Sequence, residues 1–382
     1  MKKVITLIIT SLIAISPVAK AALAPAVIKA GLEAHNRALH IKDGWIRDPY
    51  IVLGPDGYYY LTGTTPNPDD PRELNDPYNS GLDDPTITGS AAPSIVGSVV
   101  RLWRSTDLTQ WEDLGTAFSM TDGYWADVQP EAFKTVPEIE WHLWAPEIHH
   151  VDGNWIVVHT TPAPVRGGAN LAAFKGANFS GPFEHPMKEA MKGRHDPSVF
   201  QAENGTNYLL WGNTWIAPLN PGFKGFAEEP VRIDPADRRI GHEGATLRKI
   251  GNKYVHFGTA WSTDNMRKGT YNMYYCTSDN IMGPYDDRKF AGRFLGHGTP
   301  FQDKEGQWWC TAFYNANQPP ISVTASKLIS VGDTANTINQ QGVTIVPLDV
   351  RVLDIGEIYI RAKDPDYSNP GPEEAEDFPI VH

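Results

Sequence analysis

Three short motifs place an acidic side chain at the same distance before a turn. They begin at Asp48, Asp196 and Glu243, and in each the turn pair starts 8 residues after the acid. An isolated Asp-Pro most often marks a turn or the start of a strand. Three acids at one position of a repeat need a further explanation, because equivalent positions of a repeat meet in the fold. The spacing predicts a cluster of three carboxyl groups.

Such a cluster can carry out acid–base chemistry when neighbouring charges separate the pKa values of its members. Close like charges raise one pKa of a pair. We expect Asp196 and Glu243 to be neighbours, so that Glu243 holds a proton near neutral pH and acts as general acid. Asp48, farther away and beside Arg47, would stay ionised and act as base. An acid and a base about 6.5–9.5 Å apart, with a water between them, are the arrangement of an inverting glycosidase.

A repeated strand unit would position these acids. A turn pair followed by an aromatic-rich strand occurs five times, starting at Asp56, Asp152, Asn204, Gly251 and Glu305. The last four copies are 52, 47 and 54 residues apart, a length typical of one propeller blade. The sequence therefore predicts an all-β, five-bladed β-propeller in which each acid begins the innermost strand of its blade. In a closed ring of five, the third and fourth blades adjoin and face the first across the channel.

The remaining segments are assigned around this propeller. Residues 24–38 predict a short N-terminal helix, and residues 66–98, rich in Pro, Asp, Asn, Ser and Gly, predict a long loop leaving the first blade. Residues 342–362 alternate between apolar and polar side chains and should form the strands that complete the last blade. The expected division is a signal peptide at 1–21, the propeller domain at 22–362 and a loose, acidic C-terminal tail at 363–382.

The first 21 residues have the pattern of a secretory signal. Two lysines precede an apolar run at 4–15, which is too short to span a bilayer, and small residues up to Ala21 suit cleavage after that position. We expect a periplasmic or secreted protein. After export, Cys276 and Cys310 could form a disulfide or remain buried thiols.

The charge narrows the class of partner. The net charge is −12, which repels phosphate backbones and anionic lipid. We expect no nucleic-acid and no membrane partner, and an oligosaccharide or polysaccharide substrate. The oligomeric state stays open.

Taken in order, the motifs resemble glycoside hydrolase family 43 over about residues 45–315. The resemblance implies a five-bladed propeller and an inverting glycosidase, with Asp48 as general base, Asp196 as pKa modulator and Glu243 as general acid. The segments that carry it are Asp48-Pro49, Trp144-Ala145-Pro146-Glu147, Asp196-Pro197-Ser198, Glu243-Gly244 and Gly296-His297-Gly298.

The resemblance requires no cofactor. In this family the fifth-blade histidine often lies near a cation or water at the channel centre, so a structural calcium ion near His297 is one expectation. The other interpretation of His297 is a hydrogen-bonded core histidine.

Several residues near the motifs predict substrate contacts. Trp144 and Trp215 could stack on sugar rings, and Glu147 and His242 could make polar contacts. The insert from the first blade could close one end of the pocket, which favours cleavage of terminal bonds. The usual family substrates are β-xylosides and α-L-arabinofuranosides, while galactosides and other plant or algal sugars are alternatives.

Other functions stay open. His242 is compatible with an anhydro-galactosidase resembling glycoside hydrolase family 117, which relies on a histidine in its site. A non-catalytic carbohydrate-binding propeller would have the same fold without needing three converging acids. A protein-interaction propeller is disfavoured by the export signal and by the acids.

Overall fold

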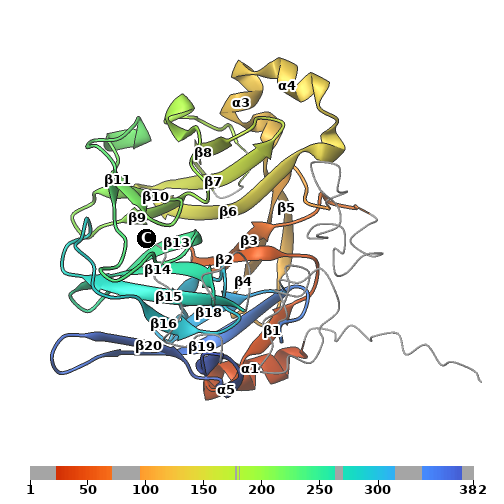
Figure 1. Cartoon of the computed structure of the whole chain (residues 1–382). Helices are drawn as coiled ribbons and strands as arrows, with labels where there is room; N and C mark the ends of the chain where they lie inside the picture. The colour runs from red at the N-terminus through yellow and green to blue at the C-terminus, as the bar shows by residue number, and fades with distance from the viewer. Residues whose placement is uncertain are drawn as a thin grey trace, which may run out of the picture.

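Five small antiparallel sheets form the blades of a five-bladed β-propeller, which confirms the predicted fold class (Figure 1). The computed structural model describes residues 23–70, 95–176, 179, 181–262, 270–314 and 338–371. The predicted signal peptide at 1–21, the middle of the insert at 71–94 and the end of the tail at 372–382 lie outside the described residues.

Each blade begins with its innermost strand and continues outward. Blade 1 contains β2 (Arg47–Leu53), β3 (Tyr59–Thr64), β4 (Val99–Ser105) and β5 (Glu112–Ser119). Blade 2 contains β6 (His142–Val151), β7 (Asn154–Ala163) and β8 (Gly168–Phe174). Blade 3 contains β9 (Ser198–Gln201), β10 (Asn207–Trp211), β11 (Trp215–Pro218) and β12 (Val231–Arg232). Blade 4 contains β13 (Glu243–Ile250), β14 (Lys253–Trp261), β15 (Tyr271–Ser278) and β16 (Lys289–Gly292).

Blade 5 combines both ends of the chain. It contains β17 (Pro300–Gln302), β18 (Trp308–Ala312), β19 (Val343–Val352), β20 (Ile358–Ala362) and the N-terminal strand β1 (Leu39–Lys42). Because β1 pairs with β19, the start of the propeller is joined to its last blade and the ring is closed. Residues 342–362 finish the last blade as predicted, whereas the sequence analysis did not identify β1, which has only four residues.

Five hydrophobic clusters fill the five interfaces between neighbouring blades. Aromatic residues of the repeated phrase lie in them: Tyr60 and Trp155 between blades 1 and 2, and Trp309 between blades 5 and 1. The other clusters join blades 2 and 3, 3 and 4, and 4 and 5. Wedge-shaped spaces between blades need large apolar side chains, which explains why the phrase is rich in aromatic residues.

The helices are short and peripheral. The predicted N-terminal helix is present as α1 (Pro25–Ala34), shorter than expected, and it buries Ile28 against blades 1 and 5. The helices α3 (Tyr124–Val128) and α4 (Pro130–Thr135) lie between blades 1 and 2 in the chain and project at the top of Figure 1. No helix in the described residues has the length and apolar character to cross a membrane.

The start of the predicted tail is ordered, so the prediction of a loose segment is wrong for residues 363–371. These residues contain α5 (Pro365–Ser368), and Tyr367 is buried in the cluster between blades 4 and 5. The Asp364 carboxylate accepts a hydrogen bond of 2.7 Å from the backbone of Ala38 and caps α5. One buried aromatic side chain thus outweighs an acidic, proline-rich composition.

Both cysteines are free and buried, which corresponds to the buried-thiol interpretation. Cys276 lies in the cluster between blades 3 and 4, and Cys310 in the cluster between blades 4 and 5.

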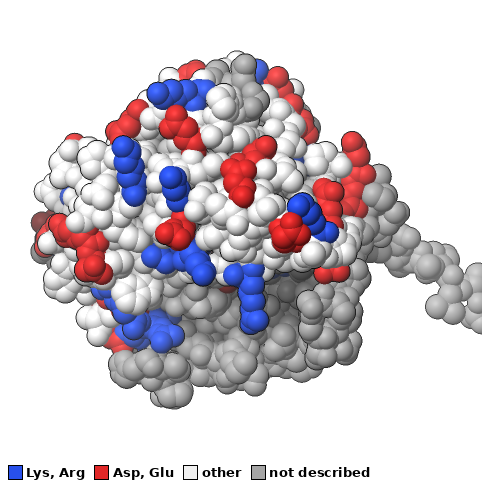
Figure 2. Space-filling view, turned by 90° about the horizontal axis from the view of Figure 1, so that it is seen from above, with Lys and Arg blue, Asp and Glu red and all other residues white. Residues whose placement is uncertain are grey.

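The surface seen from above Figure 1 carries interspersed charges. Among the described residues of this face, Lys and Arg alternate with Asp and Glu and form no stripe of one sign (Figure 2). Proteins that bind a phosphate backbone typically carry a basic patch or stripe on the surface that contacts it.

Candidate active site

The carboxyl groups of Asp48, Asp196 and Glu243 converge where the innermost strands begin, which we call the acid end of the propeller. His297 Nδ1 lies 3.1 Å from Asp48 Oδ1 and 3.9 Å from Asp196 Oδ2. Ligand atoms of Asp196, Glu243 and His195 all lie within 4.8 Å of one another. The structure thus brings together all three acids from three different blades. We call these three acids and His297 the acid cluster.

Unusual backbone conformations direct these side chains away from the blades. Asp48, Asp196 and His297 have positive φ angles of 49°, 44° and 52°, in the left-handed region that non-glycine residues rarely adopt. Strained residues of this kind concentrate at functional sites, where the surrounding fold maintains them. The irregular pairing of β2 with β3 falls at the same place, between Arg47 and Tyr50.

Strand pairing shifts the register expected for Glu243 by one residue. Arg47 pairs with Thr64, and Glu243 pairs with Thr259, so Glu243 corresponds to Arg47 and not to Asp48. The residue equivalent to Asp48 is Gly244, with φ 67°. A Cβ on Gly244 would lie 2.9 Å from the His297 ring, so glycine here allows the histidine to approach the acids.

Threonines at the ends of the second strands hold the acids. Thr64 donates to Asp48 Oδ2 at 2.8 Å and accepts from the backbone N–H of Ala145, in the next blade, at 2.7 Å. Thr160 accepts from the backbone N–H of Asp196 at 2.8 Å. The sequence analysis missed these residues, although their common position at the end of each second strand was a usable signal.

The imidazole of His297 provides positive charge within the cluster. Burial lowers its pKa, but the carboxylates of Asp48, Asp196 and Glu243 outweigh burial and raise it to about 10. His297 is therefore a cation at neutral pH. Burial has the opposite effect on the Asp48 carboxyl and raises its pKa. The charges of His297 and Arg47 outweigh burial and lower the pKa of Asp48 below its ordinary value. Asp48 is ionised, in agreement with the state expected of a base.

The expected order of the other two pKa values is wrong for the free protein. Burial raises the pKa of Asp196, and together with the charges of Glu243 and Asp48 it outweighs the lowering by His297 and His195. Burial also raises the pKa of Glu243, but His242, His297 and the Tyr271 hydroxyl outweigh it, so the pKa of Glu243 is lowered. The sequence analysis placed the raised pKa on Glu243 because these partners could not be identified from the repeat.

An aromatic stack supports Glu243. The Tyr271 hydroxyl donates a hydrogen bond to Glu243 Oε1. Tyr271 is stacked between Trp261, with ring centroids 4.5 Å apart, and His242, at 5.7 Å. His242 Nε2 lies 3.7 Å from Glu243 Oε1, and 43% of the His242 side chain is exposed. His242 therefore contacts both solvent and the acid cluster. The sequence analysis identified His242 but not Tyr271.

The other predicted contact residues occupy three different environments. Trp144 is half-buried at the acid end, in the strand position equivalent to Glu243, and packs on Trp45 and Val96. Because Val96 belongs to the last part of the insert, this end of the insert lies beside Trp144. Trp215 lies on β11 of blade 3, with 39% of its surface exposed.

Glu147 belongs to a different network. Its Oε2 lies 2.8 Å from His149 Nε2, and His149 Nδ1 lies 3.2 Å from the Tyr50 hydroxyl. Tyr50 and Glu147 lie farther along β2 and β6 than Asp48 and Ala145, so this network is displaced from the acid end. The structure does not bring Glu147 together with the three acids.

His297 is poorly suited to ligate calcium directly. Calcium prefers several oxygen ligands, and a protonated imidazole has no lone pair to offer a metal. The contact with Asp48 and the raised pKa favour His297 as a charge partner of the acids. At the same site, Asp196 and Glu243 form with His195 a group of potential metal-ligating atoms.

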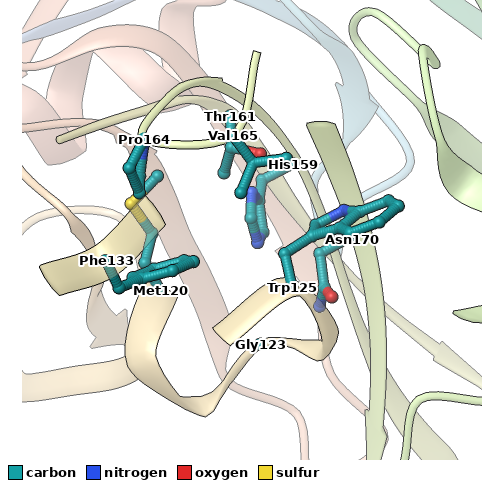
Figure 3. Close-up of a pocket in the computed structure, with 9 residues that line it drawn as sticks. All are labelled: Met120, Gly123, Trp125, Phe133, His159, Thr161, Pro164, Val165 and Asn170. Carbon is teal, nitrogen blue, oxygen red and sulfur yellow. The ribbon is translucent and has the colours of Figure 1, made fainter. Parts of the chain in front are cut away.

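A separate cavity lies off this site, between β7, β8 and the segment containing α3 (Figure 3). His159 projects into it beside Trp125 and Asn170. Burial lowers the pKa of His159 to about 3, so this histidine is neutral. The cavity volume of about 10 Å³ is enough for one water and excludes a sugar.

A pair of carboxyl groups that can serve as acid and base is the catalytic arrangement of most enzymes that hydrolyse glycosidic bonds. The family model for glycosyl hydrolases family 43 matches residues 41–329, and the chain belongs to this family. It is therefore a glycoside hydrolase acting on O-glycosyl bonds. A comparison with curated proteins gives no match.

Solved structures share the fold at low sequence identity. An endo-1,4-beta-xylanase from Bacteroides thetaiotaomicron is 21% identical, with a TM-score of 0.53 over 86% of this chain and 97% of that chain. A family 43 protein from Bacillus licheniformis is 18% identical, with a TM-score of 0.56 over 90% of this chain and 60% of that chain. An exo-1,5-alpha-L-arabinanase from a bovine ruminal metagenomic library is 17% identical, with a TM-score of 0.52 over 83% and 96%.

Proposed function

We propose that this enzyme releases terminal sugars from plant or algal oligosaccharides or polysaccharides with inversion of the anomeric centre. Asp48 is the general base, Glu243 the general acid and Asp196 the residue that adjusts the pKa of Glu243. These roles are supported by the different surroundings of the acids. His297 lowers the pKa of Asp48 and so keeps it ionised, while Asp196 and Glu243 form a close pair of carboxyl groups that competes for a proton.

The proposed reaction has one step. Asp48 takes a proton from a water molecule as the water oxygen attacks the anomeric carbon. The bond from this carbon to the leaving oxygen breaks, and Glu243 gives that oxygen its proton. The products are the inverted sugar and the shortened chain. His297 stays protonated and keeps the accepting carboxylate ionised until attack.

Glu243 must be protonated for this step, although its pKa is lowered in the free protein. The charge of His242 contributes most to lowering this pKa, and the His242 side chain is partly exposed. A bound sugar would exclude water from the site and bury Glu243 more deeply. Burial would then raise the pKa of Glu243, and the proton shared with Asp196 would move to it.

The substrate class is proposed from the relatives. The xylanase and arabinanase with this fold suggest β-xylosides and α-L-arabinofuranosides first. His242 beside Glu243 supports a second candidate, an anhydro-galactosidase of the family 117 type. We also propose export to the periplasm or the medium, from the basic and apolar pattern of residues 1–21.

A substrate panel tests the proposal. The wild-type protein and Asp48→Asn are assayed on nitrophenyl β-xyloside, α-L-arabinofuranoside and galactosides, and on xylan, arabinan and agar-derived oligosaccharides. We expect the wild-type protein to release a monosaccharide from one group and the variant to lose this activity. Binding without turnover on every member would instead indicate a carbohydrate-binding propeller.

A further inference from the structure

Trp215 is an exposed aromatic residue at the acid end of blade 3. β9 begins two residues after Asp196, and β10 runs antiparallel to it, so Trp211 at the end of β10 returns to the acid end. Trp215 pairs directly with Trp211 across the following turn. The N–H of Gly212 in this turn donates to the carbonyl of His195 at 2.8 Å. One short turn thus links Trp215 to the residue that precedes Asp196.

The exposure of Trp215 is unusual in this molecule. Large exposed apolar side chains in the described residues include only one aromatic ring, that of Trp215. Three other tryptophans near the predicted motifs are buried, with Trp45 at 2%, Trp211 at 8% and Trp261 at 6% exposure. An exposed ring presents a flat apolar face that matches the C–H face of a sugar.

Neighbouring side chains keep this ring in place. Trp211 lies nearly parallel to Trp215, with centroids 6.4 Å apart and an interplanar angle of 11°. Arg194 lies 4.6 Å above the Trp211 ring. Arg232 lies 5.9 Å from the Trp215 ring and is itself held by Asp234 at 2.6 Å. A ring that is already ordered loses little entropy on binding, which suits a recognition surface.

We propose that Trp215 is a stacking platform for a sugar unit of the leaving chain, beyond the scissile bond. This inference rests on the proposed release of a terminal sugar, because the rest of the chain is then the leaving group and must extend away from the acid cluster. Trp215 stands two strands out from β9, about 10 Å at ~4.8 Å per strand. The enzyme should therefore prefer chains long enough to reach blade 3 over short or aryl glycosides.

The test compares Trp215→Ala with Trp215→Phe and with the control Val231→Ala. Val231 is also exposed and apolar on blade 3, next to Arg232. Each protein is assayed on xylo-, arabino- and agaro-oligosaccharides from disaccharide to hexasaccharide and on the nitrophenyl glycoside. We expect Trp215→Ala to lower kcat/KM on the longest chains roughly tenfold, about 1.4 kcal/mol, with little change on the nitrophenyl glycoside. Trp215→Phe should keep most of the activity, and Val231→Ala all of it.

Binding separates this inference from the proposed reaction. The Glu243→Gln protein, with and without Trp215→Ala, is titrated with the same oligosaccharides. A roughly tenfold weaker affinity for hexasaccharide than Glu243→Gln alone supports the platform even if the proposed catalytic roles fail. Equal affinities, a loss that is the same at every chain length, or no binding of any series by the parent protein would overturn it.

Discussion

Asp48 and Asp196 are both buried where the innermost strands begin, yet their pKa values are shifted in opposite directions. Asp48 has a cation on one side, and its pKa is lowered. Asp196 lies farther from that cation, 3.9 Å from His297 Nδ1 against 3.1 Å for Asp48, and burial together with the charges of Glu243 and Asp48 outweighs His297 and His195, so its pKa is raised. Burial acts in the same direction on both, so the neighbours decide the difference. One repeated backbone unit can therefore supply both a base and a proton-holding pair.

The largest effect is expected from removing the acid or the base. Asp48→Asn should lower kcat on all substrates by about 10²–10⁴, because the attacking water loses its base. Glu243→Gln should cost a similar factor on oligosaccharides but much less on dinitrophenyl glycosides, whose leaving group needs no proton. Steady-state kinetics on both substrate types measure the contrast. Equal losses for the two variants on both substrates would contradict the assigned division.

His297→Gln tests the cation that separates the two regions. Loss of its charge should raise the pKa of Asp48, because His297 is the leading contribution that lowers it. The base must be ionised, so the acidic limb of the pH profile of kcat/KM should move to higher pH. Lys134→Gln, a change at an exposed pair with Glu131, serves as control. An unchanged acidic limb would show that His297 does not keep Asp48 ionised.

The threonines allow the two regions to be disturbed separately. Thr64→Val removes the donor to Asp48, and Thr160→Val removes the acceptor for the Asp196 N–H. Each change should cost about 1–2 kcal/mol of unfolding free energy, since a buried partner is left unsatisfied. We expect Thr64→Val to move the acidic limb to higher pH, because the Thr64 hydrogen bond lowers the pKa of Asp48, and Thr160→Val to leave that limb in place. Denaturant melts and pH profiles of both variants are the measurements, and identical profiles would show that the threonines have only a structural role.

The smallest effect is expected from Tyr271→Phe. The Tyr271 hydroxyl lowers the pKa of Glu243, so its removal should raise that pKa. A general acid must be protonated, and the basic limb should therefore move to higher pH while kcat falls only a few-fold. The unrelated buried tyrosine Tyr367 provides the matched control, Tyr367→Phe. A basic limb that moves to lower pH would contradict the role of Glu243 as acid.

The ring and the convergence of the acids could be predicted from the sequence because they follow from a local repeat. The turn and aromatic strand that start at Asp56 recur in every blade, and each copy must have the same place in the ring. The acids before them therefore had to meet.

Features that depend on contacts between distant segments could not be predicted. β1 closes the ring by pairing with residues about 300 positions away. The lowered pKa of Glu243 comes from His242, His297 and Tyr271, and two of these approach from other strands or from another blade. The register of Glu243 relative to Asp48 differs by one residue because the hairpin from Arg47 to its partner Thr64 is one residue longer than the hairpin from Glu243 to Thr259, which the count of 8 residues conceals.

The central claim is that Asp48 and Glu243 act on opposite sides of one glycosidic bond with a water between them. Proton NMR of the reaction, recorded before the released sugar mutarotates, measures this most directly. The account predicts that a β-glycoside yields the α-sugar first, or an α-glycoside the β-sugar. Release of the sugar with its original anomeric configuration would contradict it.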